Sequence, residues 1–371
     1  MLDAVELTQA LVRLDTSSGN EASAVELLAP LLRGAGADVI VDTLSPERAS
    51  LVALAGPRTR PPLVLSGHLD TVKADKGAWT FDPWSGTCAD GHVRGRGSSD
   101  MKGGVSALVS AFERYLRQTA EPADVCLVLT AGEESGCLGA LHLLEAPLIP
   151  AGGPLLVAEP TACRLATGHK GALWLRVTSH GVAAHGSRPD LGRNAITPLA
   201  RIAVALAERA LPGEHPQLGK VTANVGTIEG GTATNLVPSH ATLSVDIRTV
   251  PGVEPDRLIE TVRSFAGPAE DVTIETIVTF APVYSDPDGP FVSLMAEACR
   301  AVQGRVVPSA PLTYFTDASV LVPRLGCPEV AVLGPGDPDL AHAVDESCSA
   351  HDILEAAAIY HSVLEKWGSR P

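Results

Sequence analysis

The sequence is short of positive charge and of long apolar runs, and each shortage excludes a class of partner. Its 371 residues carry 28 Lys and Arg against 43 Asp and Glu, a formal net charge of −15. Nucleic acids and anionic membrane surfaces bind to basic patches, so neither is expected as a partner. No segment approaches the roughly 18 consecutive apolar residues of a membrane span, so no membrane partner is expected either.

Cysteines are few, and their spacing forms no pairs. There are seven, an odd number without a Cys-x-x-Cys pair, so we expect neither a disulfide framework nor a thiolate zinc site. Such cysteines are typical of small buried residues in a reducing compartment. The first 14 residues carry Asp3, Glu6 and Arg13 in an amphipathic pattern, and they lack the basic start and apolar core of a signal peptide. The sequence therefore predicts a cytoplasmic protein.

The chain is too long for one ordinary core, so two domains are expected. In its first part, apolar runs typical of strands alternate with helical patterns, as at 21–34, 63–66, 105–117 and 125–130. This alternation predicts an α/β domain with a mixed sheet and helices on both of its faces.

The pattern changes after residue 169. Segments at 172–177, 195–211, 221–228, 241–248, 254–265 and 272–278 follow the order strand–helix–strand–strand–helix–strand. That order is typical of a ferredoxin-like sandwich. We therefore expect a catalytic domain formed by residues 1–169 and 280–371, with a smaller α+β domain, 170–279, inserted into it.

Acids and a histidine follow three of the expected strands of the first domain. The strand at 63–66 leads into His68, and Asp70 lies two residues beyond His68, on the same face if the strand continues. Glu133 and Glu134 follow the strand at 125–130, and Glu159 follows the strand at 155–158. Open α/β sheets place their ligands at the carboxyl ends of strands, so these side chains are candidates for a site.

Each candidate also has a simpler explanation. A His-x-Asp pair can be a surface pair, and Glu-Glu pairs are commonly solvated helix faces. Asp100 follows a glycine-rich segment and precedes a helix, where it could act only as an N-cap. That segment does not have the order of a phosphate-binding loop, and an acid stands where a phosphate would approach.

Taken together, the candidates suit a metal centre. The set combines two imidazoles and three carboxylates without a thiolate, which favours zinc, cobalt or manganese over calcium: His68, Asp100, Glu134, Glu159 and His342. Five ligands, one of them bridging, are enough for two ions about 3.5 Å apart. Glu133 would then be the general base, and Asp70 would hold the imidazole of His68 in its ligating tautomer.

Four segments in series resemble a known family. They read Ser-Gly-His-Leu-Asp-Thr-Val at 66–72, Gly-Arg-Gly-Ser-Ser-Asp-Met-Lys-Gly-Gly at 95–104, Gly-Glu-Glu-Ser-Gly at 132–136 and Ala-Glu-Pro-Thr at 158–161. These segments resemble the signatures of the dinuclear zinc hydrolases that include acetylornithine deacetylase, succinyl-diaminopimelate desuccinylase, aminoacylase and glutamate carboxypeptidase. The resemblance spans nearly the whole chain. It implies a catalytic α/β domain interrupted by a lid that forms a homodimer interface.

The resemblance also implies roles for individual residues. His68 and Glu159 would bind one ion, Glu134 and His342 the other, and Asp100 would bridge them, with Glu133 as the base.

In the lid, three residues match segments with roles of their own. His185 would stabilise the tetrahedral oxyanion, often from the partner subunit, and Asn235 and Arg248 would hold the substrate carboxylate. The alternatives are a turn Asn and a surface Arg.

The implied reaction is metal-dependent hydrolysis of the amide bond of a small N-acyl amino acid, with two divalent ions, zinc first. Thr-Asp-Ala-Ser at 316–319 resembles the acetylornithine deacetylase branch, whereas desuccinylases usually show a Gly-Thr-Ser-Asp-type segment there. The same Thr-Asp-Ala occurs among glutamate carboxypeptidases, so a carboxypeptidase or dipeptidase is the alternative. A catalytically inactive metal-binding scaffold is a third hypothesis, but a scaffold has no need for a base such as Glu133.

Overall fold

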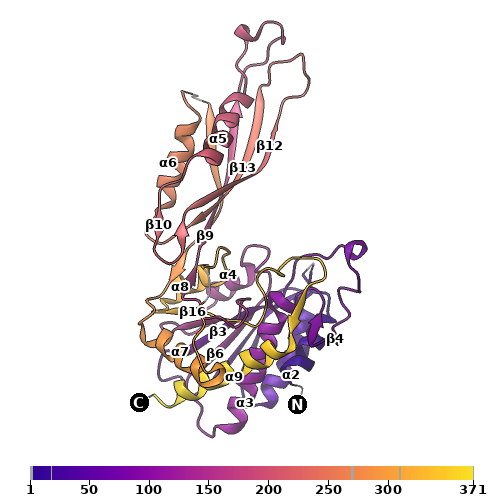
Figure 1. Ribbon diagram of the computed structural model, residues 1–371, viewed down its shortest axis with the longest axis vertical. Coiled ribbons are helices and arrows are strands. Elements are labelled where there is room, and N and C mark those ends of the chain that lie inside the picture. The colour runs from indigo at the N-terminus through magenta and orange to yellow at the C-terminus, as the bar shows by residue number, and fades with distance from the viewer. Residues whose placement is uncertain (1–2, 18, 269–270, 309–310, 371) are drawn as a thin grey trace. The chain divides into compact units, whose positions relative to one another are not determined.

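The computed structural model describes residues 3–17, 19–268, 271–308 and 311–370, and its chain forms two compact units (Figure 1). The large unit consists of Met1–Gly168, Tyr284–Ala310 and Thr316–Pro371. The inserted unit consists of His169–Val283 and Pro311–Phe315. Within the described residues, no helix is long and apolar enough to cross a membrane.

A six-stranded mixed sheet forms the centre of the large unit. Its order is β1 (Asp38–Ser45), β2 (Arg48–Ala55), β6 (Val125–Thr130), β3 (Leu63–His68), β7 (Leu155–Val157) and β16 (Val330–Val332). Strands β6, β3, β7 and β16 run parallel, whereas β1 and β2 are antiparallel to their neighbours. Every residue of β3 and β6 is buried, because helices cover both faces, and this explains their continuous apolar runs.

Helices lie on both faces of this sheet, as the sequence predicted. One face is covered by α1 (Ala4–Val12), α2 (Glu21–Gly34), α3 (Gly103–Gln118), α7 (Pro290–Gln303) and α9 (Ala350–Gly368), whose apolar residues share one core with the strands. The other face carries α4 (Leu138–Glu145) and α8 (Ala318–Leu325), which contact each other (Figure 1). The α/β architecture is confirmed.

A small second sheet connects distant parts of the sequence. Its order is β17 (Ser347–Ser349), β5 (His92–Arg94) and β4 (Thr87–Ala89). The stretch between His68 and α3 also holds the turn η1 (Lys76–Ala78) and the irregular turn η2 (Ser98–Lys102). The β5–β17 pairing brings the chain before Asp100 alongside the chain after His342.

The inserted unit is a ferredoxin-like sandwich, as predicted. Its antiparallel sheet has the order β12 (Thr222–Gly230), β13 (His240–Thr249), β9 (Gly171–His180) and β14 (Val272–Phe280). Helices α5 (Ile196–Glu208) and α6 (Pro255–Phe265) contact each other and the sheet. Short elements complete the chain: β8 (Gly168–His169), η3 (Pro189–Leu191), β10 (Glu214–His215), β11 (Gly219–Lys220) and β15 (Val283–Tyr284).

The bounds of the inserted unit differ from the predicted 170–279. The structure begins it at His169, continues it to Val283 and adds Pro311–Phe315, which the sequence had placed in the catalytic domain. Aromatic packing explains the added segment. The ring of Phe315 lies 4.6 Å from that of Phe280 and 6.2 Å from that of Trp174.

Candidate metal centre

Three neighbouring parallel strands end at one edge of the large sheet, and each delivers candidate side chains there. His68 is the last residue of β3, Glu133 and Glu134 follow β6, and Glu159 follows β7. Because β6, β3 and β7 are parallel neighbours, their carboxyl ends meet at this edge. Asp100 comes from η2, and His342 comes from the loop after β16.

Asp100 lies between the two imidazoles. Its Oδ1 is 3.1 Å from His68 Nε2, and its Oδ2 is 3.4 Å from His342 Nε2. Each imidazole has a second carboxylate: His68 Nε2 is 3.8 Å from Glu159 Oε1, and His342 Nε2 is 2.8 Å from Glu134 Oε1. The structure therefore brings all five candidate ligands together, with one carboxylate between two His–Glu pairs.

The cluster is buried on one side and open on the other. The side chain of His68 is only 2% exposed, whereas that of His342 is 51% exposed. One ligand atom each from His68, Asp100 and Glu134 lies within 4.8 Å of the others, close enough for metal binding. A substrate would reach the cluster from the side of His342.

The electrostatics of the cluster favour added positive charge. Burial lowers the pKa of His68, but hydrogen bonds to Asp100 and Asp70 outweigh it and raise the pKa well above its usual value. Hydrogen bonds to Asp100 and Glu134 raise the pKa of His342 to about 10. At Asp100 burial raises the pKa, but hydrogen bonds from both histidines outweigh it, and the pKa is lowered below its usual value. Divalent cations satisfy the same carboxylates that here stabilise imidazolium protons, so the donor set fits a metal.

Asp70 contacts both His68 and the turn after β6. His68 Nδ1 is 3.0 Å from the backbone carbonyl of Asp70 and 3.4 Å from its carboxylate. The carboxylate accepts hydrogen bonds from the backbone N–H groups of Glu133, at 3.0 Å, and Glu134, at 3.1 Å. The sequence suggested an Asp70 carboxylate that orients the imidazole. In the structure the carbonyl makes the shorter contact, and the carboxylate fixes the position of the two glutamates.

Glu133 has the surroundings of a general base. It is 6% exposed. Burial raises its pKa well above the usual range, and the carboxylates of Glu159, Asp317 and Glu134 add to the shift against the opposing charge of His68. A raised carboxyl pKa approaches the range in which a base accepts and returns a proton near neutral pH.

The other three predicted residues belong to the inserted unit. His185 Nδ1 accepts hydrogen bonds from the backbone N–H of Ser187 at 3.1 Å and from its hydroxyl at 2.7 Å. In its neutral form His185 therefore carries its proton on Nε2, where it can be donated. Asn235 is adjacent, since its carbonyl accepts from the N–H of Gly186 at 2.7 Å.

Arg248 lies on β13, at the end of the inserted unit's sheet away from His185 and Asn235. Its guanidinium donates to Asp246 at 3.0 and 3.2 Å and lies over the ring of Phe315. On β13, Arg248 is eight residues from His240, about 26 Å at ~3.3 Å per residue. His185 and Asn235 are found beyond the His240 end, since Gly181 donates to Ser239. Within one inserted unit, Arg248 and His185 cannot contact the same small molecule.

Sequence reasoning missed two buried residues beside the cluster. Glu346, fully buried, accepts hydrogen bonds from the backbone that leads into Asp100, and it pairs with Arg96. Arg96 lies within a recognised segment, but nothing in the spacing links it to an acid 250 residues away.

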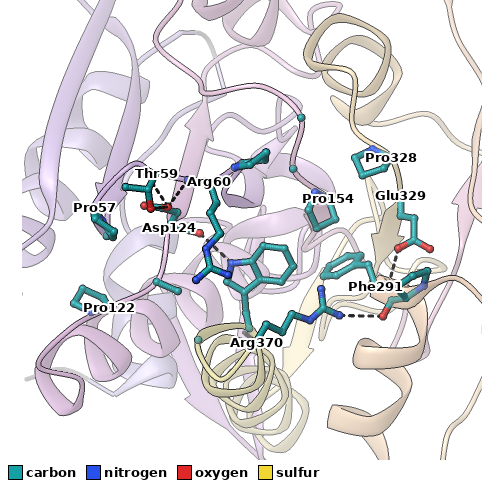
Figure 2. Close-up of a pocket in the computed structure, with 18 of the residues that line it drawn as sticks. Pro57, Thr59, Arg60, Pro122, Asp124, Pro154, Phe291, Pro328, Glu329 and Arg370 are labelled. Atoms are coloured by element: carbon teal, nitrogen blue, oxygen red, sulfur yellow. Dashed lines mark hydrogen bonds between the residues drawn. The ribbon is translucent and has the colours of Figure 1, made fainter.

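A cavity of about 1050 Å³ lies elsewhere in the large unit, where β6, β7 and β16 begin (Figure 2). Asp124 Oδ2 accepts the N–H groups of Thr59 and Arg60 at 3.0 and 2.9 Å, so it orders a loop. The indole of Trp367 donates to the carbonyl of Asp124, and Arg370 donates to that of Pro290. None of the described lining residues is a histidine or cysteine. We therefore place the chemistry at the cluster around Asp100.

Comparison with known proteins identifies the family. The sequence pattern of peptidase family M20/M25/M40 matches residues 64–366. A probable succinyl-diaminopimelate desuccinylase of Staphylococcus epidermidis is 30% identical, with 98% of each chain covered. A succinyl-diaminopimelate desuccinylase of Rhodospirillum centenum is 29% identical over 100% of this chain and 99% of its own.

Solved structures share the fold at low sequence identity. The aminopeptidase PepT of Bacillus cereus superimposes with a TM-score of 0.80 at 19% identity, with 98% of each chain covered. The metallo-carboxypeptidase Sso-CP2 of Sulfolobus solfataricus gives 0.79 at 19% identity, covering 99% of this chain and 100% of its own. These matches extend over the large unit and the inserted unit alike. The chain belongs to peptidase family M20/M25/M40 and is a hydrolase of amide bonds that binds divalent metal.

Proposed function

We propose that this protein is a deacylase that hydrolyses the amide bond of an N-acyl amino acid with the help of two divalent ions. Zinc is the first choice, and the same donor set accepts cobalt or manganese. The observation that carries the proposal is the position of Asp100, whose two carboxylate oxygens face two separate His–Glu pairs. A carboxylate in that position suits a bridge.

The proposed ligands divide into two sets around Asp100. His68 and Glu159 would hold one ion, and Glu134 and His342 would hold the other. The donor chemistry fits, because imidazole nitrogen and carboxylate oxygen are the ligands that catalytic zinc sites use. The chemistry that such ions supply when bound is Lewis acidity, which polarises an amide carbonyl and lowers the pKa of water.

Glu133 would perform the proton transfers. Its carboxylate accepts a proton from the attacking water and returns it to the nitrogen of the leaving amine, so that hydrolysis yields a carboxylic acid and a free amine. Two features of the structure support this role: the side chain is buried, and the backbone N–H of Glu133 is held by Asp70. The glutamate therefore has a defined position and an elevated pKa.

His185 would stabilise the oxyanion of the tetrahedral intermediate with its Nε2 proton, and Asn235 and Arg248 would bind the substrate carboxylate. Arg248 is about 26 Å from the end of the sheet that carries the other two. One substrate can meet all three residues only if they come from two chains. We therefore propose a homodimer in which each site receives His185 and Asn235 from the partner.

The acyl group and the amino acid belong to the proposal as well. The relatives quoted above are named as desuccinylases, whereas Thr-Asp-Ala-Ser at 316–319 resembles the deacetylase branch. The structural neighbours include an aminopeptidase and a carboxypeptidase, which keeps a peptidase as the second candidate. The two candidates differ in which side of the amide carries the recognised carboxylate.

Amine release from a substrate panel tests the proposal. The panel contains N-acetylornithine, N-succinyl-diaminopimelate, N-acetylcitrulline, N-acetylmethionine and several dipeptides, with zinc or cobalt added. We expect turnover of an acylated amino acid that disappears in Glu133→Ala. Cleavage of dipeptides alone would instead assign the protein to the peptidases.

A further inference from the structure

One buried carboxylate organises the backbone around Asp100. Glu346 Oε1 accepts hydrogen bonds from the backbone N–H groups of Ser99, at 2.8 Å, and Asp100, at 3.0 Å. Its Oε2 accepts from the N–H of Gly97 at 2.9 Å and from Arg96 Nη1 at 2.6 Å. Four donors thus converge on a side chain that has no exposed surface. This network fixes the path of the chain into Asp100.

Arg96 extends the same network to His342. The guanidinium is 4% exposed, and its second nitrogen, Nη2, donates to the backbone carbonyl of His342 at 3.3 Å. Its planar face lies over the indole of Trp79, 5.0 Å from the ring centre. One side chain therefore contacts both Glu346 and the backbone of His342.

The loop that carries His342 depends on such contacts. His342 and Asp345 have φ values of 63° and 60°, in the left-handed region that residues with a Cβ seldom adopt. Asp345 is anchored by Thr80, whose N–H and hydroxyl donate to its carboxylate at 2.8 and 2.9 Å. Arg96 donates to the carbonyl of His342, and the backbone carbonyl of Glu346 accepts from the N–H of Gly95 at 2.9 Å. Without these anchors the backbone would favour other conformations.

We propose that Arg96 and Glu346 are positioning residues for the metal site, an inference that rests on the proposed function. Asp100 and His342 are far apart in sequence, and they belong to separate loops. The Arg96–Glu346 pair connects those loops and sets the distance between the two ligands. The pair does so through backbone groups, without contact with metal or substrate.

Fold stability alone does not explain this arrangement. A buried ion pair can often be replaced by apolar residues without loss of stability, so its presence is weak evidence for a stabilising role. Apolar residues cannot supply acceptors for the backbone N–H groups of Gly97, Ser99 and Asp100. Residues behind metal ligands typically change metal affinity by about 10–100-fold when they are altered.

Glu346→Gln provides the test, because glutamine keeps the size of the side chain but replaces one acceptor oxygen with a donor NH₂. We expect zinc affinity, measured by chelator competition, to fall about 10–100-fold. The visible absorption spectrum of the cobalt-loaded protein, which reports ligand geometry, should shift as well. Glu113→Gln is the matched control, since Glu113 is also a buried glutamate paired with an arginine, Arg117, but on α3.

Arg96→Lys is the second variant. It retains the positive charge but loses the fork that reaches both Glu346 and His342. We expect the same cobalt shift and weaker zinc binding, while circular dichroism shows a folded protein. Wild-type zinc affinity and an unchanged spectrum in either folded variant would overturn the positioning role alone. Failure of the unaltered protein to bind zinc or cobalt would overturn the proposed function and this inference with it.

Discussion

Asp70 Oδ1 accepts a hydrogen bond from the backbone N–H of Glu133 at 3.0 Å, and so connects the ends of two neighbouring strands. Oδ2 of the same carboxylate accepts from Glu134 at 3.1 Å, and the Asp70 carbonyl lies 3.0 Å from His68 Nδ1. One residue thus fixes a proposed base and two proposed ligands relative to one another. We therefore predict that Asp70 supports catalysis by holding Glu133, Glu134 and His68 in place.

Asp70→Asn should lower kcat about 10–100-fold in a folded protein, because the amide NH₂ would replace one of the two oxygens that accept these N–H groups. Steady-state kinetics with the substrate found in the panel would measure the change. Asp75→Asn is the matched control, since Asp75 also accepts a backbone N–H, that of Gly77, but at an exposed position. Equal rates for Asp70→Asn and the wild-type protein would contradict the positioning role.

Glu133→Gln and Glu134→Gln should separate catalysis from metal binding, although the residues are adjacent. Loss of a general base typically costs about 10²–10⁴-fold in rate. Glu133→Gln should therefore lose activity by that amount and retain its metal. Glu134→Gln should lose metal, measured as ions per chain by atomic emission after dialysis. If Glu133→Gln also lost its metal, Glu133 would be a ligand and another residue would be the base.

Metal binding should compete with protons. The raised pKa of both histidines, about 10 for His342, means that the metal-free chain holds imidazolium at neutral pH. That protonated form contributes stability that is fully present below about pH 6.5 and is lost as the pH rises through about 10. Ions bind neutral imidazole, so zinc affinity should rise with pH, and binding at pH 7 should release the protons held by His68 and His342. Calorimetry in buffers of different ionisation enthalpy counts them, and a proton count near zero would contradict the assigned ligands.

Two inactive variants should restore activity when they are mixed, if His185 acts on the partner's site. In a dimer of one His185→Ala chain and one Glu133→Gln chain, one site has both residues intact. With random exchange of subunits, such mixed dimers make up half of the population. Each has one intact site of two, so about a quarter of the wild-type rate is expected. Unmixed variants are the control. No recovery, despite proven subunit exchange, would mean that His185 acts within its own chain.

Local sequence patterns predicted most of the fold, and the exceptions have physical reasons. Alternating and continuous apolar runs identified β3, β6 and the strands of the inserted unit, because burial selects those residues directly. Helices α4 and α8 were not suggested. Helix α4 has eight residues and begins after Cys137, which has a positive φ of 56°, and α8 contains Pro323. Both are stabilised by packing against each other and the sheet, which no local pattern records.

The site residues that follow strands could be placed from the sequence, whereas those in loops could not. His68, Glu134 and Glu159 follow recognisable strands, so their approach to one another could be inferred from the parallel order of the sheet. The contact of Asp100 with His342 could not, because both lie in loops whose paths are set by tertiary hydrogen bonds. Glu346 was missed for that reason, since its partners lie about 250 residues earlier in the chain.

Crystallography of the zinc-loaded protein at the zinc absorption edge would show whether two ions bind on either side of Asp100. We expect two anomalous peaks about 3.5–4 Å apart, one on either side of the Asp100 carboxylate. The first peak should contact His68 and Glu159, and the second Glu134 and His342. A single peak, or two peaks that do not share Asp100, would contradict the proposed two-ion site.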